Sequence, residues 1–243
     1  MRKLIAAAVV AGATLIAGQA IAADFPEYPP IIEIPEVDYG VEGSFYLRGS
    51  AAFNGLWTEE GIGYECGACE TTFPFEEMGY GYSVGAGFGY ETGTGLRADV
   101  TVDYVNNEDI EFSSPSGLGN YSAKLRSTIA LANVYYDFSL GGEYGYGAAG
   151  GAFGYVGAGA GVAFNRIEAS TPAGDAVPSG NNTSFAAAAM AGVGYDFGSV
   201  VADVGYRGVY IAEVSNRAAV PQNIAAENNW LHEVRGTVRY RFN

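Results

Sequence analysis

After residue 43 the chain alternates between apolar and polar side chains over long stretches. In the clearest run, 96–104, every even position is apolar and every odd position is polar. A second run at 232–242 alternates in the same way, with His232 as the one imperfect member of its apolar face. Because successive side chains of an extended chain point to opposite faces, a period of two predicts β-strands with one apolar and one polar face.

Further runs alternate less strictly and bring the number of predicted strands to eight. The connections between them alternate in length: long polar ones are separated by shorter ones at 92–94, 140–142 and 198–199. Short turns at one end and long loops at the other are typical of membrane β-barrels. The further runs lie at 44–56, 79–91, 123–138, 152–164, 185–197 and 200–211, and the long connections at 57–78, 105–122, 165–184 and 212–229.

The pattern predicts an all-β fold, an eight-stranded antiparallel up-and-down β-barrel. The composition agrees, since 36 glycines, 18 tyrosines and 13 phenylalanines favour short strands over helices. With an even number of strands, the N-terminus and the C-terminus of the barrel chain lie on the same side, the side of the short turns. In an outer membrane this side is the periplasm, and the four long loops are extracellular.

The segment before the barrel divides into two parts. Residues 1–22 have a basic start, an apolar middle and a small-residue end, which indicates a signal peptide. An uncleaved membrane anchor is the alternative, but the apolar stretch is short for a spanning helix. Residues 23–42 are rich in proline and acids and predict an extended periplasmic tail. The barrel then occupies residues 43–243.

The charge of the chain weighs against nucleic acid as a partner. The formal net charge is −15, and it becomes −17 when Arg2 and Lys3 leave with the signal peptide.

Charges on the predicted strands indicate which face meets lipid. One face carries six arginines and six acids, a balance that suggests mutual ion pairing. An arginine on the lipid face at the bilayer midplane costs about 2–4 kcal/mol, so these residues are predicted to line the lumen of a transmembrane barrel. The alternative is a soluble barrel, in which the polar face would lie outside and the apolar face inside. The aromatic residues near the strand ends disfavour it, because they resemble the girdle at a membrane interface. The predicted lumen residues are Arg48, Arg97, Asp99, Asp103, Asp137, Asp196, Asp203, Arg207, Glu233, Arg235, Arg239 and Arg241.

The run at 123–138 is the least regular. Asn133 and Asp137 indicate one inward face, while Lys124 and Arg126 fall on the other. Either a β-bulge or an extension of the strand beyond the membrane would reconcile them.

Short motifs in order along the chain resemble the OmpA-like family of eight-stranded outer-membrane barrels, particularly the small, porin-like surface proteins of alphaproteobacteria. The resemblance implies a C-terminal signal for the outer-membrane assembly machinery at Val238, Tyr240 and Phe242. The family usually ends on the aromatic residue, whereas here Asn243 follows Phe242. The resemblance also implies covalent attachment of Ala23-Asp24 to peptidoglycan, with a leader that only aids export as the alternative. The motifs are FYLRG at 45–49, LRAD at 96–99, ANVYYDF at 132–138, YVGAG at 155–159, GVGYD at 192–196, GYR at 205–207 and RYRF at 239–242.

Candidate chemistry is sparse. Cys66 and Cys69 lie in the first long loop, where a disulfide is favoured over a redox or metal site because neither a thioredoxin-type helix nor further ligands are evident. His232 is the single histidine, and its neighbour Glu233 points to the opposite face of the strand, so a hydrolytic dyad is disfavoured. We therefore expect no enzyme activity, no metal and no cofactor.

The sequence favours a structural outer-membrane protein that supports envelope integrity. Its expected partners are outer-membrane lipid and lipopolysaccharide, the assembly machinery and peptidoglycan. Two alternatives stay open. The loops of the barrel could form a surface adhesin or ligand-binding site. A pore of small conductance is less favoured, because side chains fill the lumen of an eight-stranded barrel.

Overall fold

The computed structural model describes residues 43–58, 60–64, 70–77, 79–113, 119–140, 151–171, 173–219 and 222–242. Among these residues no helix is long and apolar enough to cross a membrane. The regular structure consists of strands: β1 (Ser44–Trp57), β2 (Glu60–Tyr64), β3 (Glu70–Glu77), β4 (Gly79–Glu91), β5 (Leu96–Ser113), β6 (Asn120–Ser139), β7 (Gly151–Ser170), β8 (Ala176–Asp196), β9 (Val200–Ser215) and β10 (Ala225–Phe242).

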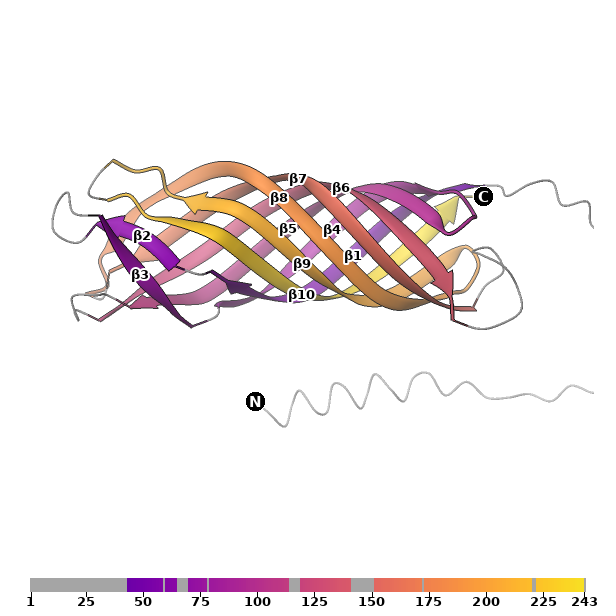
Figure 1. The fold of residues 1–243 in the computed structure, drawn as a ribbon, viewed down its shortest axis with the longest axis horizontal. Helices are drawn as coiled ribbons and strands as arrows, with labels where there is room; N and C mark the ends of the chain where they lie inside the picture. The colour runs from indigo at the N-terminus through magenta and orange to yellow at the C-terminus, as the bar shows by residue number, and fades with distance from the viewer. Residues whose placement is uncertain are drawn as a thin grey trace, which may run out of the picture. The chain divides into compact units, whose positions relative to one another are not determined.

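Eight of these strands form a closed antiparallel barrel, as the sequence predicted. Each pairs with the next in the order β1, β4, β5, β6, β7, β8, β9, β10, and β10 pairs back with β1 from Phe45↔Phe242 to Trp57↔Trp230. The strands wrap around the barrel axis with a strong tilt (Figure 1). Closure gives every barrel strand a paired neighbour on both sides over most of its length, which satisfies the backbone hydrogen bonds there.

β2 and β3 extend the barrel wall at the end away from β10's C-terminus (Figure 1). They form a hairpin in which β2 pairs with β10 at Ala225↔Ile62 and β3 pairs with β5 at Phe75↔Phe112. The hairpin continues the wall beyond the point where the pairing of β1 with β4 ends, at Leu56↔Gly79. We call this end of the barrel the loop end and the other the turn end.

The predicted long loops were wrong in extent, because the strands run far into them. The predicted loop at 165–184 contains the end of β7 and the start of β8, which pair as far as Ser170↔Ala176. The predicted loops at 105–122 and 212–229 are shortened in the same way, and the predicted loop at 57–78 contains the β2–β3 hairpin. In these extensions the outward face becomes polar, while apolar residues such as Ile167 and Phe112 lie inside, so the alternation seen in the rest of the strands is lost while the backbone ladder continues.

Two of the connections at the turn end are tight, as the sequence predicted: the one from β4 to β5 and the one from β8 to β9. The third, predicted at 140–142, is longer, because β6 ends at Ser139 and β7 begins at Gly151, and residues 141–150 lie outside the described part of the chain. Gly93 and Gly95 in the first turn and Gly198 in another have φ of 74°, 91° and 96°. Glycine adopts these left-handed conformations without the steric cost that a Cβ atom brings.

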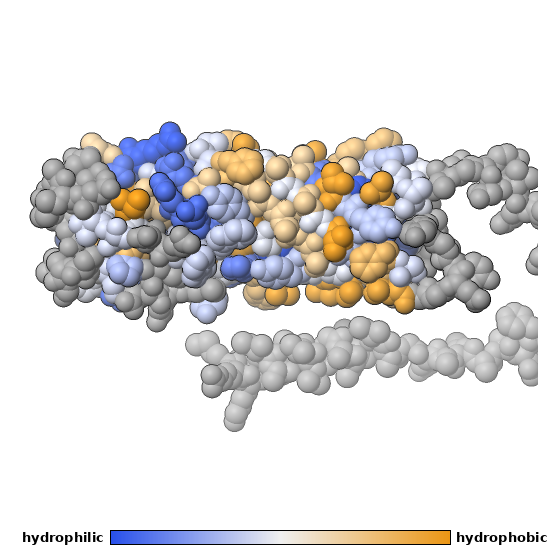
Figure 2. Space-filling model, viewed as in Figure 1, coloured by the Kyte–Doolittle hydropathy of each residue, from blue (hydrophilic) through white to orange (hydrophobic). Residues whose placement is uncertain are grey.

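Apolar side chains cover the outside of the barrel between its two ends, and Figure 2 shows this region in orange beside a blue hydrophilic patch toward the loop end. On β10 the outward apolar positions run from Trp230 to Phe242. At about 3.4 Å per residue and a tilt of about 40°, this length spans about 30 Å, close to the ~25 Å apolar band of outer-membrane barrels. We call this region the apolar belt.

β6 extends beyond the apolar belt, which explains its irregular pattern. Lys124 and Arg126 point outward near its loop end, while Asn133 and Asp137 point into the lumen nearer the turn end. Pairing with β7 is uninterrupted from Ser122↔Ser170 to Ser139↔Phe153. Of the two explanations that the sequence allowed, the extension of the strand is therefore the right one.

Candidate functional site

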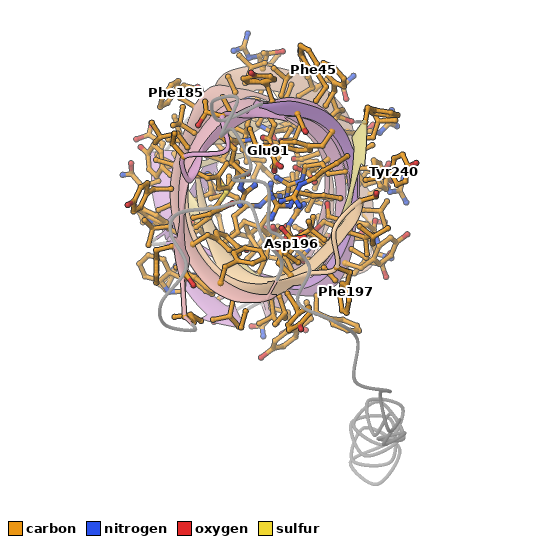
Figure 3. All side chains as sticks on the ribbon, turned by 90° about the vertical axis from the view of Figure 1, so that its right-hand side faces the viewer. Phe45, Glu91, Phe185, Asp196, Phe197 and Tyr240 are labelled. Carbon is orange, nitrogen blue, oxygen red and sulfur yellow. The ribbon has the colours of Figure 1, made fainter. Side chains whose placement is uncertain are left out.

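The lumen holds the main cluster of charged side chains. Viewed along the barrel, nitrogen and oxygen atoms gather inside the wall with Glu91 and Asp196 pointing inward, whereas Phe45, Phe185, Phe197 and Tyr240 point outward (Figure 3). All twelve residues that the sequence assigned to the lumen have side chains that form an ion pair there. They are arranged in three successive layers.

Near the middle of the barrel, Asp103, Arg207, Glu233 and Arg235 form what we call the central quartet. Asp103 receives one hydrogen bond from Nη1 of Arg207 and one from Nη1 of Arg235, each 2.6 Å long. Glu233 accepts from the same two arginines at 2.5 and 2.9 Å. Both acids are fully removed from solvent, so each guanidinium bridges two buried carboxylates.

The second layer lies nearer the turn end and is centred on Asp99. Arg48 donates from Nη1 to Asp99 at 2.8 Å and to the hydroxyl of Tyr135 at 2.7 Å. Tyr46 donates its hydroxyl to the same carboxylate at 3.0 Å, and the Nδ2 of Asn133 donates to it at 2.7 Å. Three donors therefore surround a single buried acid.

The third layer closes the turn end. Arg97 pairs with Asp137 at 2.8 Å, and Arg241 pairs with Asp196 at 2.6 Å. Arg241 also contacts Glu91. Arg239 lies between Glu91, Asp137 and Asp203, with N···O distances of 3.6 to 3.8 Å.

The sequence analysis missed several partners in these layers. Glu91 is a further lumen acid. The odd positions of β4 face inward, so the alternation of that strand already assigned Glu91 to the lumen. Ser83 shares that face and donates to Glu233 at 2.6 Å. Tyr46 and Tyr135 were overlooked because aromatic residues were expected to face lipid.

Glycines on β4 make room for these charged layers. A Cβ atom on Gly85 would collide with the carboxylate of Asp103, and one on Gly89 would meet the ring of Tyr46 at 2.6 Å. The small residues of this strand therefore make room for the bulky side chains directly opposite them on the neighbouring strands β5 and β1.

Little space remains between the charged side chains. The void beside Arg48, Tyr135 and Arg207 measures about 10 Å³, which is about the volume needed to hold one water molecule. In the described part of the lumen, the three layers thus leave no channel of the width that an open porin has.

Toward the loop end the lumen changes from charged to uncharged groups. The Nδ2 of Asn107 donates to the side-chain oxygen of Asn54 at 2.9 Å, and that of Asn165 donates to the hydroxyl of Ser184 at 3.1 Å. Buried apolar residues such as Leu125 and Ile167 lie beyond them.

A cavity opens at the loop end. It measures about 210 Å³, and its walls come from the β2–β3 hairpin, β5, β6, β7, β8 and the segment before β10. The ring of Phe73 lies edge-on to that of Tyr121, with centroids 5.3 Å apart. Thr171, Gln222 and Asn223 supply polar groups, and among the described residues no charged side chain lines the cavity. We call it the loop-end cavity.

Several predicted features lie outside the described residues: the signal peptide at 1–22, the tail at 23–42 with Ala23 and Asp24, the cysteines Cys66 and Cys69, and Asn243. The disulfide and the peptidoglycan attachment stay predictions. The predicted assembly residues Val238, Tyr240 and Phe242 lie on the lipid-facing side of β10. His232 also points outward, with Nδ1 2.5 Å from the hydroxyl of Tyr206, on the face opposite to Glu233.

A closed eight-stranded barrel with an apolar outside and a charged inside has the fold of small outer-membrane β-barrel proteins. Among solved structures, Neisserial surface protein A is 24% identical, with 83% of this chain and 99% of that chain covered and a TM-score of 0.50. OprG from Pseudomonas aeruginosa is 14% identical, with 84% and 98% covered and a TM-score of 0.49. Ail of Yersinia pestis is 13% identical, with 83% and 99% covered and a TM-score of 0.40.

These similarities concern the fold alone. No family model and no curated protein matches the chain. The resemblance to the OmpA-like family therefore stays a prediction.

Proposed function

We propose that this protein is a non-conducting outer-membrane barrel with a structural role in the envelope. The observation that carries the proposal is the charged lumen, in which three layers of paired side chains surround a void of about 10 Å³. Removing one partner of a buried ion pair typically costs about 3–5 kcal/mol, so opening a path through these layers is unfavourable. A lumen built in this way stabilises the barrel instead of conducting ions.

The proposed orientation follows from the two ends of the barrel. Phe45 pairs with Phe242 at the turn end, so the first barrel strand begins there and the last one ends there. Short turns face the periplasm in outer-membrane barrels, which makes the loop end extracellular. The barrel then contacts outer-membrane lipid and lipopolysaccharide, and the assembly machinery inserts it.

The structural role extends to peptidoglycan through the tail at 23–42. About 18 proline-rich residues at ~3.1 Å each span ~56 Å in a polyproline-like conformation, enough to cross much of the periplasm. Attachment at Ala23 would then join the outer membrane to the cell wall.

Electrophoretic mobility of the membrane-fraction protein tests both parts of this proposal. We expect boiling to change the mobility, as for a folded barrel, and lysozyme digestion to release a ladder of peptidoglycan-linked species. Deletion of the tail, 23–42, should abolish the ladder and preserve the dependence on heat. Persistence of the ladder without the tail contradicts the tether, and nanosiemens conductance in planar bilayers contradicts the sealed lumen.

A second candidate function is the binding of a small ligand at the cell surface, which the loop-end cavity favours. A cavity of about 150 Å³ lined by apolar side chains accommodates benzene, and the loop-end cavity measures about 210 Å³. An uncharged molecule with one ring or a short acyl chain matches its volume and lining.

Calorimetric titration of the folded barrel with toluene tests this second candidate. We expect saturable binding to the parent protein. Ala169→Phe should abolish this binding, because the larger side chain fills the cavity. Equal heats for the two proteins would show that the cavity does not bind the probe.

A further inference from the structure

A group of basic side chains lies on the outward face of β6 and β7, at the loop-end border of the apolar belt. Lys124, Arg126 and Arg166 are 52%, 44% and 53% exposed. The register places Arg126 directly opposite Arg166. Asn106 on β5 lies opposite Arg126, and Asn181 on β8 lies opposite Arg166, so four polar residues form one continuous row across four strands.

The position of this row relative to the belt fits the level of lipid headgroups. Two residues nearer the turn end, the same faces of β5 and β7 carry Tyr104 and Phe164, which are 41% and 51% exposed. Two residues correspond to about 5 Å along the membrane normal for a strand tilted by about 40°. Aromatic residues mark the membrane interface of such barrels, so Arg126 and Arg166 stand immediately outside it.

The charges in this group are not balanced by their protein partners. Like charges directly opposite each other on neighbouring strands are destabilising. Glu168 lies between the two guanidinium groups, 3.1 Å from Arg166 and 3.4 Å from Arg126. Lys124 is 4.0 Å from Glu108. Three basic groups thus share two acids, in a chain whose net charge is −15.

We infer that Arg126 and Arg166 bind a phosphate group of lipid A in the surrounding leaflet. Guanidinium groups recognise phosphate through paired, charge-assisted hydrogen bonds, and a phosphate monoester carries about −1.5 to −2 charges, which matches the unbalanced pair. Glu168 has an alternative partner, because it lies directly opposite Lys124. When phosphate binds, Glu168 turns to Lys124, and the amides of Asn106 and Asn181 flank the site.

The assignment to lipid A rests on the proposed function, because that orientation places the loop end in the outer leaflet. The shared chemistry is a phosphate held between two arginines. Phosphatidylglycerol and inorganic phosphate offer related groups and serve as competing probes in the test.

The test measures, by native mass spectrometry, how much lipid A the folded, detergent-solubilised mature protein binds. The probes are bis-phosphorylated lipid A, fully dephosphorylated lipid A, phosphatidylglycerol and inorganic phosphate. Loss of a charge-assisted hydrogen bond corresponds to about a tenfold or larger change in affinity. We expect the protein to bind the bis-phosphorylated form at least about tenfold more tightly than the dephosphorylated form, and Arg126→Gln and Arg166→Gln each to remove most of this preference.

Arg217→Gln is the matched control, because it removes the same charge outside the group and should keep the preference. Arg126→Lys with Arg166→Lys keeps the charge and should recover only part of it, since lysine lacks the bidentate geometry.

The inference is overturned if Arg166→Gln keeps the full preference, or if Arg217→Gln loses it equally. It is also overturned if phosphatidylglycerol or millimolar inorganic phosphate competes as well as lipid A. Heat-dependent mobility is measured on every variant. A variant that stays heat-modifiable but loses the preference supports the site, and a parent barrel that shows no preference refutes the site while leaving the structural role intact.

Discussion

The central quartet makes a strong prediction about stability. Asp103→Asn preserves the size of the side chain but removes the charge that two arginines share, each through a 2.6 Å hydrogen bond. The asparagine amide also directs a donor toward one of these guanidinium groups. Removing one partner of a buried charge pair costs about 3–5 kcal/mol, and we expect a loss of that size in the free energy of unfolding.

Urea unfolding of the barrel in lipid vesicles, followed by electrophoretic mobility, measures this loss. Asp175→Asn is the matched control, because Asp175 is exposed in the connection between β7 and β8, where substitutions change stability by about 0.5 kcal/mol or less. The double variant Asp103→Asn with Arg235→Gln should lose less free energy of unfolding than the sum of the two single variants, because it removes both charges of one ion pair. A loss below about 1 kcal/mol for Asp103→Asn would refute the view that the quartet holds the lumen together.

Three further predictions address the wall and the first loop. Gly85→Val should destabilise the barrel by about 1–3 kcal/mol in the same assay, because its side chain meets Asp103, and Gly236→Val, where a Cβ meets no atom within 4 Å, should cost less. Val234→Arg should reduce stability in vesicles by about 2–4 kcal/mol, because Val234 is 62% exposed on the lipid side; Val234→Leu should be nearly neutral, and equal effects would contradict a lipid-facing position. Cys66 and Cys69 should resist alkylation of the denatured protein until a reductant is added, and immediate labelling would contradict the disulfide.

Much of the barrel could be predicted from the sequence, because alternation is a local property. The odd positions of 96–104 and of 232–242 were assigned to the lumen, and the structure places Arg97, Asp103 and Arg235 there. The irregular run at 123–138 was ambiguous for a physical reason. Leu125, Ile129 and Leu131 are apolar yet point into the lumen, where they join the buried cluster toward the loop end.

The ends of the strands could not be predicted in the same way. Beyond the apolar belt the outward face of a strand becomes polar, while apolar residues such as Ile167 and Phe112 lie inside, so the pattern that marked the strands of the belt is lost. Asn165 and Asn182 lay in a predicted loop, yet their amides donate to the backbone oxygen of Glu213 inside the barrel, at 3.1 and 2.9 Å. Such contacts depend on neighbouring strands and leave no signal in a single segment.

The sequence by itself determined the number of barrel strands, their antiparallel order and the inward face of the twelve predicted lumen charges, since these follow from period-two patterning and connection lengths. Only the tertiary structure decided which charges meet. Asp103 pairs with Arg207 and Arg235, which are 104 and 132 residues away, and Arg126 stands opposite Arg166. These neighbours are set by the register of eight paired strands and by the closure of β10 on β1, and a shift of two residues would keep every face and change every partner.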